Sequence, residues 1–89
     1  MEIEMKKKSE KTRVAYEGWL KVLGRSIARR RKQLGWTQAK TAENSGFDLK
    51  FYQDLEYGRR PCSTRTLFTL AKGMKTTIKA LVVDAEKGK

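Results

Sequence analysis

The chain has 89 residues, and its 21 Lys and Arg residues against 10 Asp and Glu residues give a net charge of +11. This length allows one small domain and excludes a multidomain enzyme. With no histidine and a single cysteine, Cys62, the chain cannot hold a Ser-His-Asp triad, a structural zinc site of Cys and His or an internal disulfide. We therefore expect no enzymatic activity, no catalytic residues, no metal and no cofactor. No apolar run approaches the length of a membrane span, so we expect a soluble cytoplasmic protein that does not contact a membrane.

Apolar and charged residues are unevenly distributed along the chain. Of the 18 Leu, Ile, Val and Phe residues, 16 lie between Leu20 and Val83. This distribution predicts a folded domain over residues 20–83, a basic arm or helical extension over 1–19 and a frayed tail over 84–89. Residues 1–32 carry 11 basic and 4 acidic side chains, whereas residues 33–61 carry 4 of each. An excess of positive charge of this size favours polyanionic partners, nucleic acid first and acidic membrane or protein surfaces second.

The spacing of the apolar residues predicts an all-α protein with five helices. The first helix begins near Val14 and ends at Gly35, a residue that readily adopts the left-handed conformation. Its apolar stripe consists of Leu20, Leu23, Ile27 and Leu34. Thr37 is a suitable N-cap for a second helix from Gln38 to Ser45, and Gly46 ends that helix.

Three further helices follow. The third runs to about Tyr57 and is followed by a loop over Gly58–Pro61, which composition marks as irregular. The fourth has an apolar face, and the fifth is short and ends near residue 82. The predicted N-caps of these three helices are Asp48, Ser63 and Thr77.

The second and third helices, joined by a tight turn at Gly46, match the helix-turn-helix unit. Residues 23–82 resemble the Cro and lambda-repressor-like (XRE-type) helix-turn-helix family. The resemblance is most specific in the segment RRKQLGWTQ at 30–38, in Ala42 and Gly46, and in LEYGRR at 55–60. It implies a five-helix lambda-repressor-like DNA-binding domain with an N-terminal extension, whose third helix enters the major groove.

The resemblance also implies roles for individual side chains. Base contacts are implied for four residues on the outer side of the third helix: Leu49, Lys50, Gln53 and Asp54. Contacts with the DNA backbone are implied for Thr37, Gln38, Arg59, Arg60 and Ser63. Arg30, on the charged face of the first helix, is a further candidate for a backbone contact. Arg31 and Glu56 match a structural ion pair that ties the first helix to the third.

Some of these residues also have a simpler interpretation. The alternative for Lys50 and Gln53 is a solvated helix face, and the alternative for Leu49 is packing in a dimer. The sequence also departs from the family pattern, because Tyr52 stands where an aliphatic residue is usual. We expect the hydroxyl of Thr41 or Ser45 to bond the Tyr52 hydroxyl. A second departure is Lys75, which stands where glycine normally closes the fourth helix.

Together these features predict a sequence-specific transcriptional regulator. We expect a repressor that acts as a homodimer on a palindromic operator in double-stranded DNA. The alternative is an antitoxin, or another protein-interaction module, that neutralises a partner protein and also binds its own operator.

Overall fold

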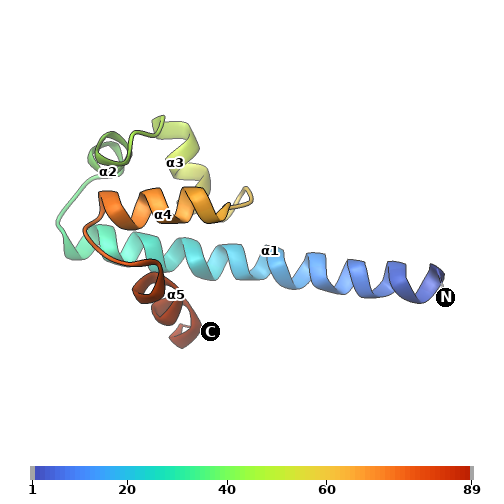
Figure 1. Cartoon of the computed structure of the whole chain (residues 1–89). Coiled ribbons are helices and arrows are strands. Elements are labelled where there is room, and N and C mark those ends of the chain that lie inside the picture. Colours follow the sequence, from blue (N-terminus) through green and yellow to red (C-terminus); the bar gives the residue numbers. More distant parts are fainter. Residues whose placement is uncertain (1, 89) are drawn as a thin grey trace.

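A computed structural model describes residues 2–88, with side chains from Ser9 onward. It confirms the prediction of an all-α protein, since every regular element in this range is a helix (Figure 1). The helices are α1 (Glu2–Gln33), α2 (Gln38–Ser45), α3 (Leu49–Glu56), α4 (Thr64–Gly73) and α5 (Ile78–Lys87). Both α3 and α5 pack on α1, while α2 packs on α3 and α4. None of the described helices is both long enough and apolar enough to cross a membrane.

The N-caps of α2 to α5 are the residues predicted from the sequence. In each case a side-chain oxygen accepts a hydrogen bond from a backbone N–H in the first turn, which satisfies a donor that has no partner within the helix. These caps are Thr37, Asp48, Ser63 and Thr77. Gly46, at φ +72°, closes α2 in the left-handed conformation, so the turn between α2 and α3 depends on glycine. The boundaries of the helix-turn-helix unit are therefore set by local chemistry.

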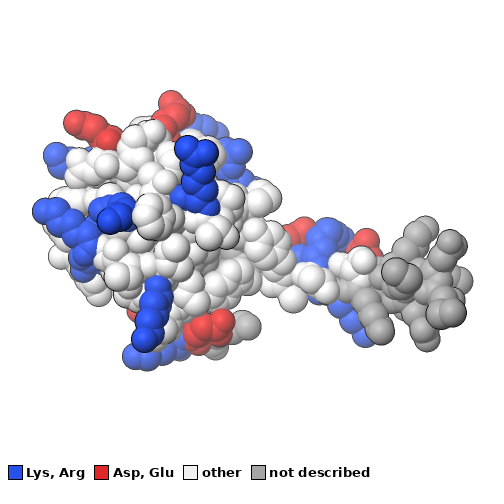
Figure 2. All heavy atoms as spheres, in the orientation of Figure 1, with Lys and Arg blue, Asp and Glu red and all other residues white. Residues whose placement is uncertain are grey.

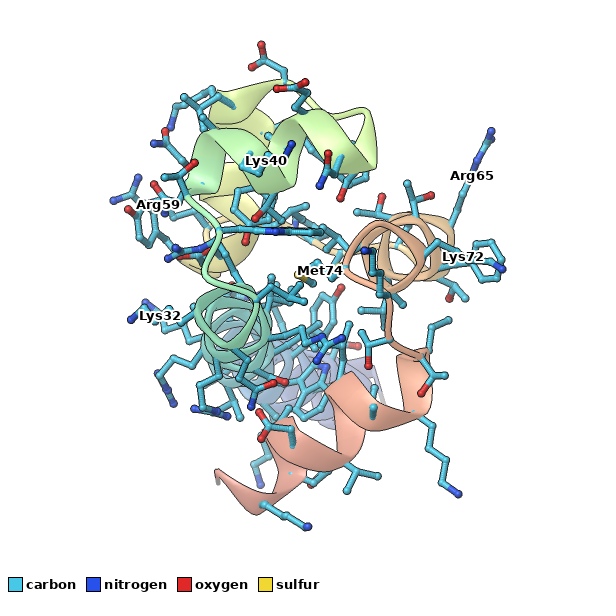
Figure 3. All side chains as sticks on the ribbon, turned by 90° about the vertical axis from the view of Figure 1, so that its left-hand side faces the viewer. Lys32, Lys40, Arg59, Arg65, Lys72 and Met74 are labelled. Carbon is cyan, nitrogen blue, oxygen red and sulfur yellow. The ribbon has the colours of Figure 1, made fainter. Side chains whose placement is uncertain are left out.

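The core lies where α1, α3, α4 and α5 meet. Its most deeply buried large side chains are Ile27, Tyr52, Leu70 and Met74. Figure 3 shows Met74 between α4 and α1. Because Tyr52 belongs to α3, burial of this ring fixes α3 against the core and leaves the opposite side of that helix exposed.

Helix α1 is longer than predicted. It begins at Glu2 instead of near Val14, and its first half extends well beyond the other helices (Figure 1). The physical reason is that residues 2–17 contain no glycine or proline and are rich in Glu and Lys, which are good helix formers. We refer to residues 9–18 as the arm; every side chain in it is exposed.

Helix α5 is also longer than predicted, and a frayed tail that begins at residue 84 is wrong. The helix continues to Lys87, because Ala85 is fully buried one turn after Leu81. In addition, an ion pair of 2.7 Å joins the Arg29 guanidinium to the Asp84 carboxylate, and this hydrogen-bonded contact lowers the pKa of Asp84. Packing against α1 therefore extends α5 by more than a turn.

The expected bond from Thr41 or Ser45 to Tyr52 is absent from the described part of the chain. The Thr41 hydroxyl donates to the Thr37 carbonyl at 3.0 Å, and the Tyr52 hydroxyl donates to Glu56. The buried Ser45 hydroxyl has no hydrogen-bond partner among the described residues. The prediction was wrong because Glu56, one turn along α3, offers Tyr52 a charged acceptor.

This unpaired hydroxyl leads to a stability prediction. Ser45→Ala removes a buried polar group that has lost its water without gaining a partner, so we expect the free energy of unfolding to rise by about 1 kcal/mol. Urea denaturation followed by circular dichroism measures this. Thr41→Val is the matched control, because it removes a hydroxyl that has a partner, and no increase is expected. A decrease in the Ser45→Ala variant would contradict the assignment of an unpaired group.

Candidate nucleic-acid interface

Glu56, in the last turn of α3, joins three helices. Its carboxylate accepts two hydrogen bonds of 2.9 Å from Arg31, one from Tyr52 and one of 3.1 Å from Gln38. Burial by itself raises the pKa of Glu56, but the hydrogen bonds from Arg31, Tyr52 and Gln38 outweigh it, and the pKa lies below its ordinary value. The Arg31 side chain also donates to the Trp36 carbonyl at 2.9 Å. The predicted pair of Arg31 and Glu56 is therefore present, and it is bidentate.

The outer side of α3 carries polar side chains that contact one another in a continuous series. Gln53 donates to Gln38 at 3.2 Å, and Gln38 in turn donates to the Tyr57 hydroxyl at 3.1 Å. The Arg59 guanidinium lies over the Tyr57 ring, 4.8 Å from its centroid. We call this set the recognition surface: Gln38, Leu49, Lys50, Gln53, Asp54, Tyr57 and Arg59. Leu49 belongs to it because it is 41% exposed and lies one turn before Gln53.

Lys50 and Asp54 form an ion pair within the recognition surface. The Lys50 ammonium lies 2.8 Å from the Asp54 carboxylate, and Arg59 lies 3.9 Å from the same oxygen. The hydrogen bond from Lys50 lowers the pKa of Asp54, so this carboxylate stays ionised. An acidic residue at this place is compatible with a polyanionic partner because two cations flank it. Lys50 itself remains 69% exposed.

The loop after α3 holds its two arginines on aromatic rings. While Arg59 lies over Tyr57, the Arg60 guanidinium lies 4.2 Å from the centroid of the Phe51 ring. Both arginines are exposed, and in Figure 3 Arg59 projects from the side of the domain opposite to Arg65 and Lys72. Because stacking leaves the N–H donors of a guanidinium free at its edge, both groups can still bind a phosphate.

Thr37 and Ser63 lie at the first turns of α2 and α4. Their hydroxyls are already used as caps, accepting from the N–H groups of Lys40 at 3.0 Å and Thr66 at 3.1 Å. Each nevertheless lies beside a helix N-terminus, where backbone N–H groups and the helix dipole favour an anion.

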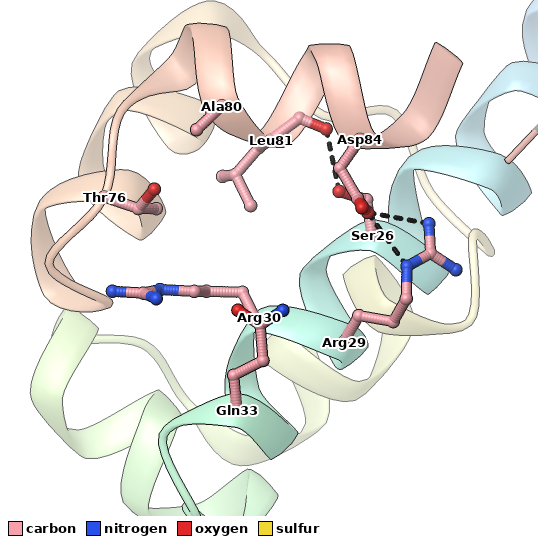
Figure 4. A pocket seen from close by; sticks show the side chains of 8 residues that line it. All are labelled: Ser26, Arg29, Arg30, Gln33, Thr76, Ala80, Leu81 and Asp84. Atoms are coloured by element: carbon pink, nitrogen blue, oxygen red, sulfur yellow. Dashed lines mark hydrogen bonds and ion pairs between the residues drawn. The ribbon is translucent and has the colours of Figure 1, made fainter. Parts of the chain in front are cut away.

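Arg30 has a structural role, which corrects its assignment to the DNA backbone. Its guanidinium turns toward the connection between α4 and α5 (Figure 4). There it donates to the carbonyls of Met74 and Lys75, each at 3.0 Å. Lys75 adopts the left-handed conformation at φ +56°, which is unfavourable for a residue other than glycine. Arg30 therefore holds the turn that Lys75 makes in place of a glycine, and it lies outside the candidate interface.

Beside Arg30 the surface is hollowed by a cavity of about 250 Å³ between α1 and α5. Most of its polar side chains are used within the protein: Ser26 donates to the Leu81 carbonyl at 2.7 Å, and Arg29 pairs with Asp84 (Figure 4). Across the described residues, no three Cys, Asp or Glu side chains gather in a way that could hold a metal ion. Cys62 is half-buried, and burial raises the pKa of its thiol.

Two features of the interface were missed by the sequence reasoning. Tyr57, which connects Gln38 to Arg59, was placed only at a helix end; an exposed aromatic next to a basic loop was the available signal. The second feature is the bond from Gln53, predicted to contact a base, to Gln38, predicted to contact the DNA backbone. The spacing of the residues could not predict this bond, because it depends on the angle between α2 and α3.

Residues 27–81, more than half of the chain, match the family model described as Helix-turn-helix. The chain is an XRE-type helix-turn-helix protein. This confirms the family predicted from residues 23–82, and with it DNA binding and transcription regulation as the general function.

This helix-turn-helix protein is 33% identical over 67 residues to y4dJ, an uncharacterised HTH-type transcriptional regulator of Sinorhizobium fredii, with 75% of this chain and 87% of y4dJ covered. Its fold is similar to that of the restriction-modification controller protein C.AhdI of Aeromonas hydrophila, with a TM-score of 0.68, 26% identity, and coverage of 70% and 94% of the two chains. The clp gene regulator ClgR of Corynebacterium glutamicum has the same fold, with a TM-score of 0.74, 22% identity, and coverage of 78% and 90%.

Proposed function

We propose that this helix-turn-helix protein is a sequence-specific repressor that binds a palindromic operator as a homodimer in the cytoplasm. The observation that carries the proposal is the recognition surface. One side of α3 is fixed in the core by Tyr52. The other side presents Leu49, Lys50, Gln53 and Asp54. Of these, Gln53 bonds Gln38 of α2, and Asp54 lies next to Arg59 of the loop after α3. A major groove is wide enough to admit one such helix.

Within the groove, four side chains of α3 face the bases. Lys50 suits the acceptors of guanine, Gln53 suits adenine, and Leu49 suits the methyl group of thymine. Asp54 accepts from Lys50 in the free protein and can accept from a cytosine amino group in the complex. Specificity therefore comes from a few side chains on a segment with no net charge, residues 33–61.

On either side of α3, other groups hold the DNA backbone. Gln38 lies at the start of α2, where the N-terminal N–H groups favour a phosphate. Its amide bonds Glu56 and Tyr57 in the free protein and turns to the same phosphate in the proposed complex. The other backbone contacts in this proposal come from Thr37, Arg59, Arg60 and Ser63. These contacts fix the register of α3 in the groove, and they carry no sequence information themselves.

A dimer follows from the size of the surface. One α3 offers four base-facing side chains, which is too few to select one site in a genome. Two copies related by a two-fold axis read two half-sites about 34 Å apart, and an operator occupied in this way is closed to transcription.

Two substitutions separate base reading from backbone contact. We expect Lys50→Ala to reduce the preference for one base pair by about 10-fold to 100-fold. Arg59→Ala is expected to weaken binding to all duplexes alike. It should also reduce the slope of log K against log salt concentration by the contribution of about one phosphate. The measurement is selection of a binding site from random duplexes, followed by fluorescence anisotropy at several salt concentrations. Arg65→Ala is the control, because Arg65 is exposed on the opposite side of the domain. An unchanged base preference in Lys50→Ala would mean that α3 is not placed as proposed.

A further inference from the structure

The arm is a helical segment whose surface is not covered by the rest of the domain. All its described side chains are exposed, with Tyr16 40% and Val14 60% exposed, whereas Leu20, just after the arm, is buried. Good helix formers and the continuity of the arm with the rest of α1 account for the helix itself. Its uncovered surface is open to a second helix that packs on it.

One face of the arm is uncharged and has the spacing of a coiled-coil seam. Ser9, Thr12 and Tyr16 follow one another at intervals of three and four residues, which is the alternation of a heptad repeat. Trp19, at the next position, is half-buried against the core of the domain. We call Ser9, Thr12 and Tyr16 the seam. The charged groups of the arm lie beside the seam and bond one another: Arg13 forms ion pairs of 2.8 Å with both Glu10 and Glu17.

The charge of the arm disfavours DNA as the covering partner. Its two basic residues, Lys11 and Arg13, are balanced by Glu10 and Glu17. Figure 2 shows acidic and basic side chains next to each other along it. The positive charge of the first third of the chain comes instead from residues 21–32, which hold six basic and no acidic residues. A neutral helix can pair with its own copy without the repulsion that two strongly basic surfaces would have.

The sizes of the seam residues select an antiparallel pair. With a two-fold axis between residues 12 and 13, Tyr16 faces Ser9 of the second copy, so a large side chain meets a small one twice. A parallel pair would place the two Tyr16 rings against each other. Where the seam reaches the domain, an open groove of about 440 Å³ is lined by Tyr16, Leu20 and Pro61, and Arg59 and Arg60 also border it.

The same axis also gives the spacing that a palindromic operator needs. Gly24, which touches α3 at Glu56, lies 23 residues from its counterpart along the paired helices, or about 34 Å at 1.5 Å per residue. Gly24 also lies about 90° around α1 from the middle of the seam. The two α3 helices therefore lie on the same side of the paired arms, one turn of DNA apart.

We propose that the arm is the dimer interface of this protein, with the seams of two copies packed antiparallel. This inference rests on the homodimer of the proposed function and adds where it forms. The test is sedimentation velocity of the full chain without DNA, beside the variants Tyr16→Glu and Val14→Glu. These introduce the same charge on opposite faces of one exposed helix, so their effects on the monomer are matched.

We expect the wild type and Val14→Glu to sediment as dimers, and Tyr16→Glu to dissociate with a dimer dissociation constant raised by about 100-fold. Circular dichroism at equal concentration checks that the variants are folded. A monomeric wild type would overturn the inference, and so would equal effects of the two substitutions. Dissociation by Phe68→Glu but not by Tyr16→Glu would also overturn it, since Phe68 is an exposed apolar residue on α4.

Cross-linking tests the antiparallel register separately. In a Cys62→Ser background, Thr12→Cys places two thiols next to the two-fold axis, so oxidation is expected to yield a covalent dimer. Lys11→Cys, about 100° around the helix, is the matched control and is expected to remain uncross-linked. Cross-linking of both variants, or of neither, would contradict the register. Sedimentation and cross-linking are measured without DNA. A negative result there would overturn the proposed dimer interface and would leave the proposed operator binding to be tested separately.

Discussion

Replacing Arg31 with alanine is expected to lower the free energy of unfolding by about 3–5 kcal/mol. The Glu56 side chain is only 5% exposed, and Arg31 is the only cation bonded to it among the described residues. Removing the guanidinium leaves a buried carboxylate that Tyr52 and Gln38 alone must satisfy. Since Glu56 belongs to α3 and bonds Gln38 of α2, we also expect weaker binding to the operator.

The pH dependence of this variant should reverse in sign. In the wild type the pKa of Glu56 lies below its unfolded value, so its contribution to stability is present above about pH 4.3 and is lost as the pH falls through the folded pKa. Without Arg31, burial becomes the dominant effect and raises that pKa. Protonation then stabilises the fold, so this carboxyl should make the variant more stable below about pH 4.3 than at pH 7.

Arg29→Ala is the matched control on the same helix. The pair of Arg29 and Asp84 has both side chains 44% exposed, and exposed ion pairs contribute less than about 1 kcal/mol. Urea denaturation of both variants between pH 4 and pH 7, followed by circular dichroism, makes the comparison. If Arg31→Ala and Arg29→Ala lowered the free energy of unfolding equally, burial of Glu56 would not govern the strength of its bond to Arg31.

The sequence contained the information that fixes the helix boundaries between residues 37 and 77. Thr37, Asp48, Ser63 and Thr77 cap their own helices within three residues, so the responsible chemistry is local. The same holds for Gly46, which only has to supply a positive φ. The pair of Arg31 and Glu56 was predicted because the family resemblance supplied what spacing alone could not.

The remaining differences involve contacts between residues far apart in the chain. Arg30 bonds the carbonyls of Met74 and Lys75, more than forty residues away, so a charged helix face could not reveal its role. The end of α5 depends in the same way on Arg29 and on the burial of Ala85. The spacing of apolar residues also predicted too late a start for α1, because the polar first half of this helix has no apolar stripe to mark where it begins.

Gly24→Ala is expected to destabilise the protein by about 3 kcal/mol or more, although alanine is the better helix former. A Cβ at this position would overlap the Glu56 carbonyl and lie 2.9 Å from the Leu55 carbonyl oxygen. Both are backbone atoms at the end of α3, so the overlap is relieved only if α3 moves away from α1. That movement would also strain the bond between Arg31 and Glu56.

Gly18→Ala separates this packing effect from helix propensity. A Cβ at Gly18 meets no described atom within 4 Å, so the substitution should raise the free energy of unfolding by up to about 1 kcal/mol. Urea denaturation of both variants gives the comparison, and anisotropy on the selected operator shows whether the tilt of α3 has changed. If Gly24→Ala were as stable as Gly18→Ala, α1 and α3 could not be in backbone contact. The two glycines have the same intrinsic cost in a helix, so opposite outcomes would show that Gly24 is required for the close approach of α1 to the recognition helix.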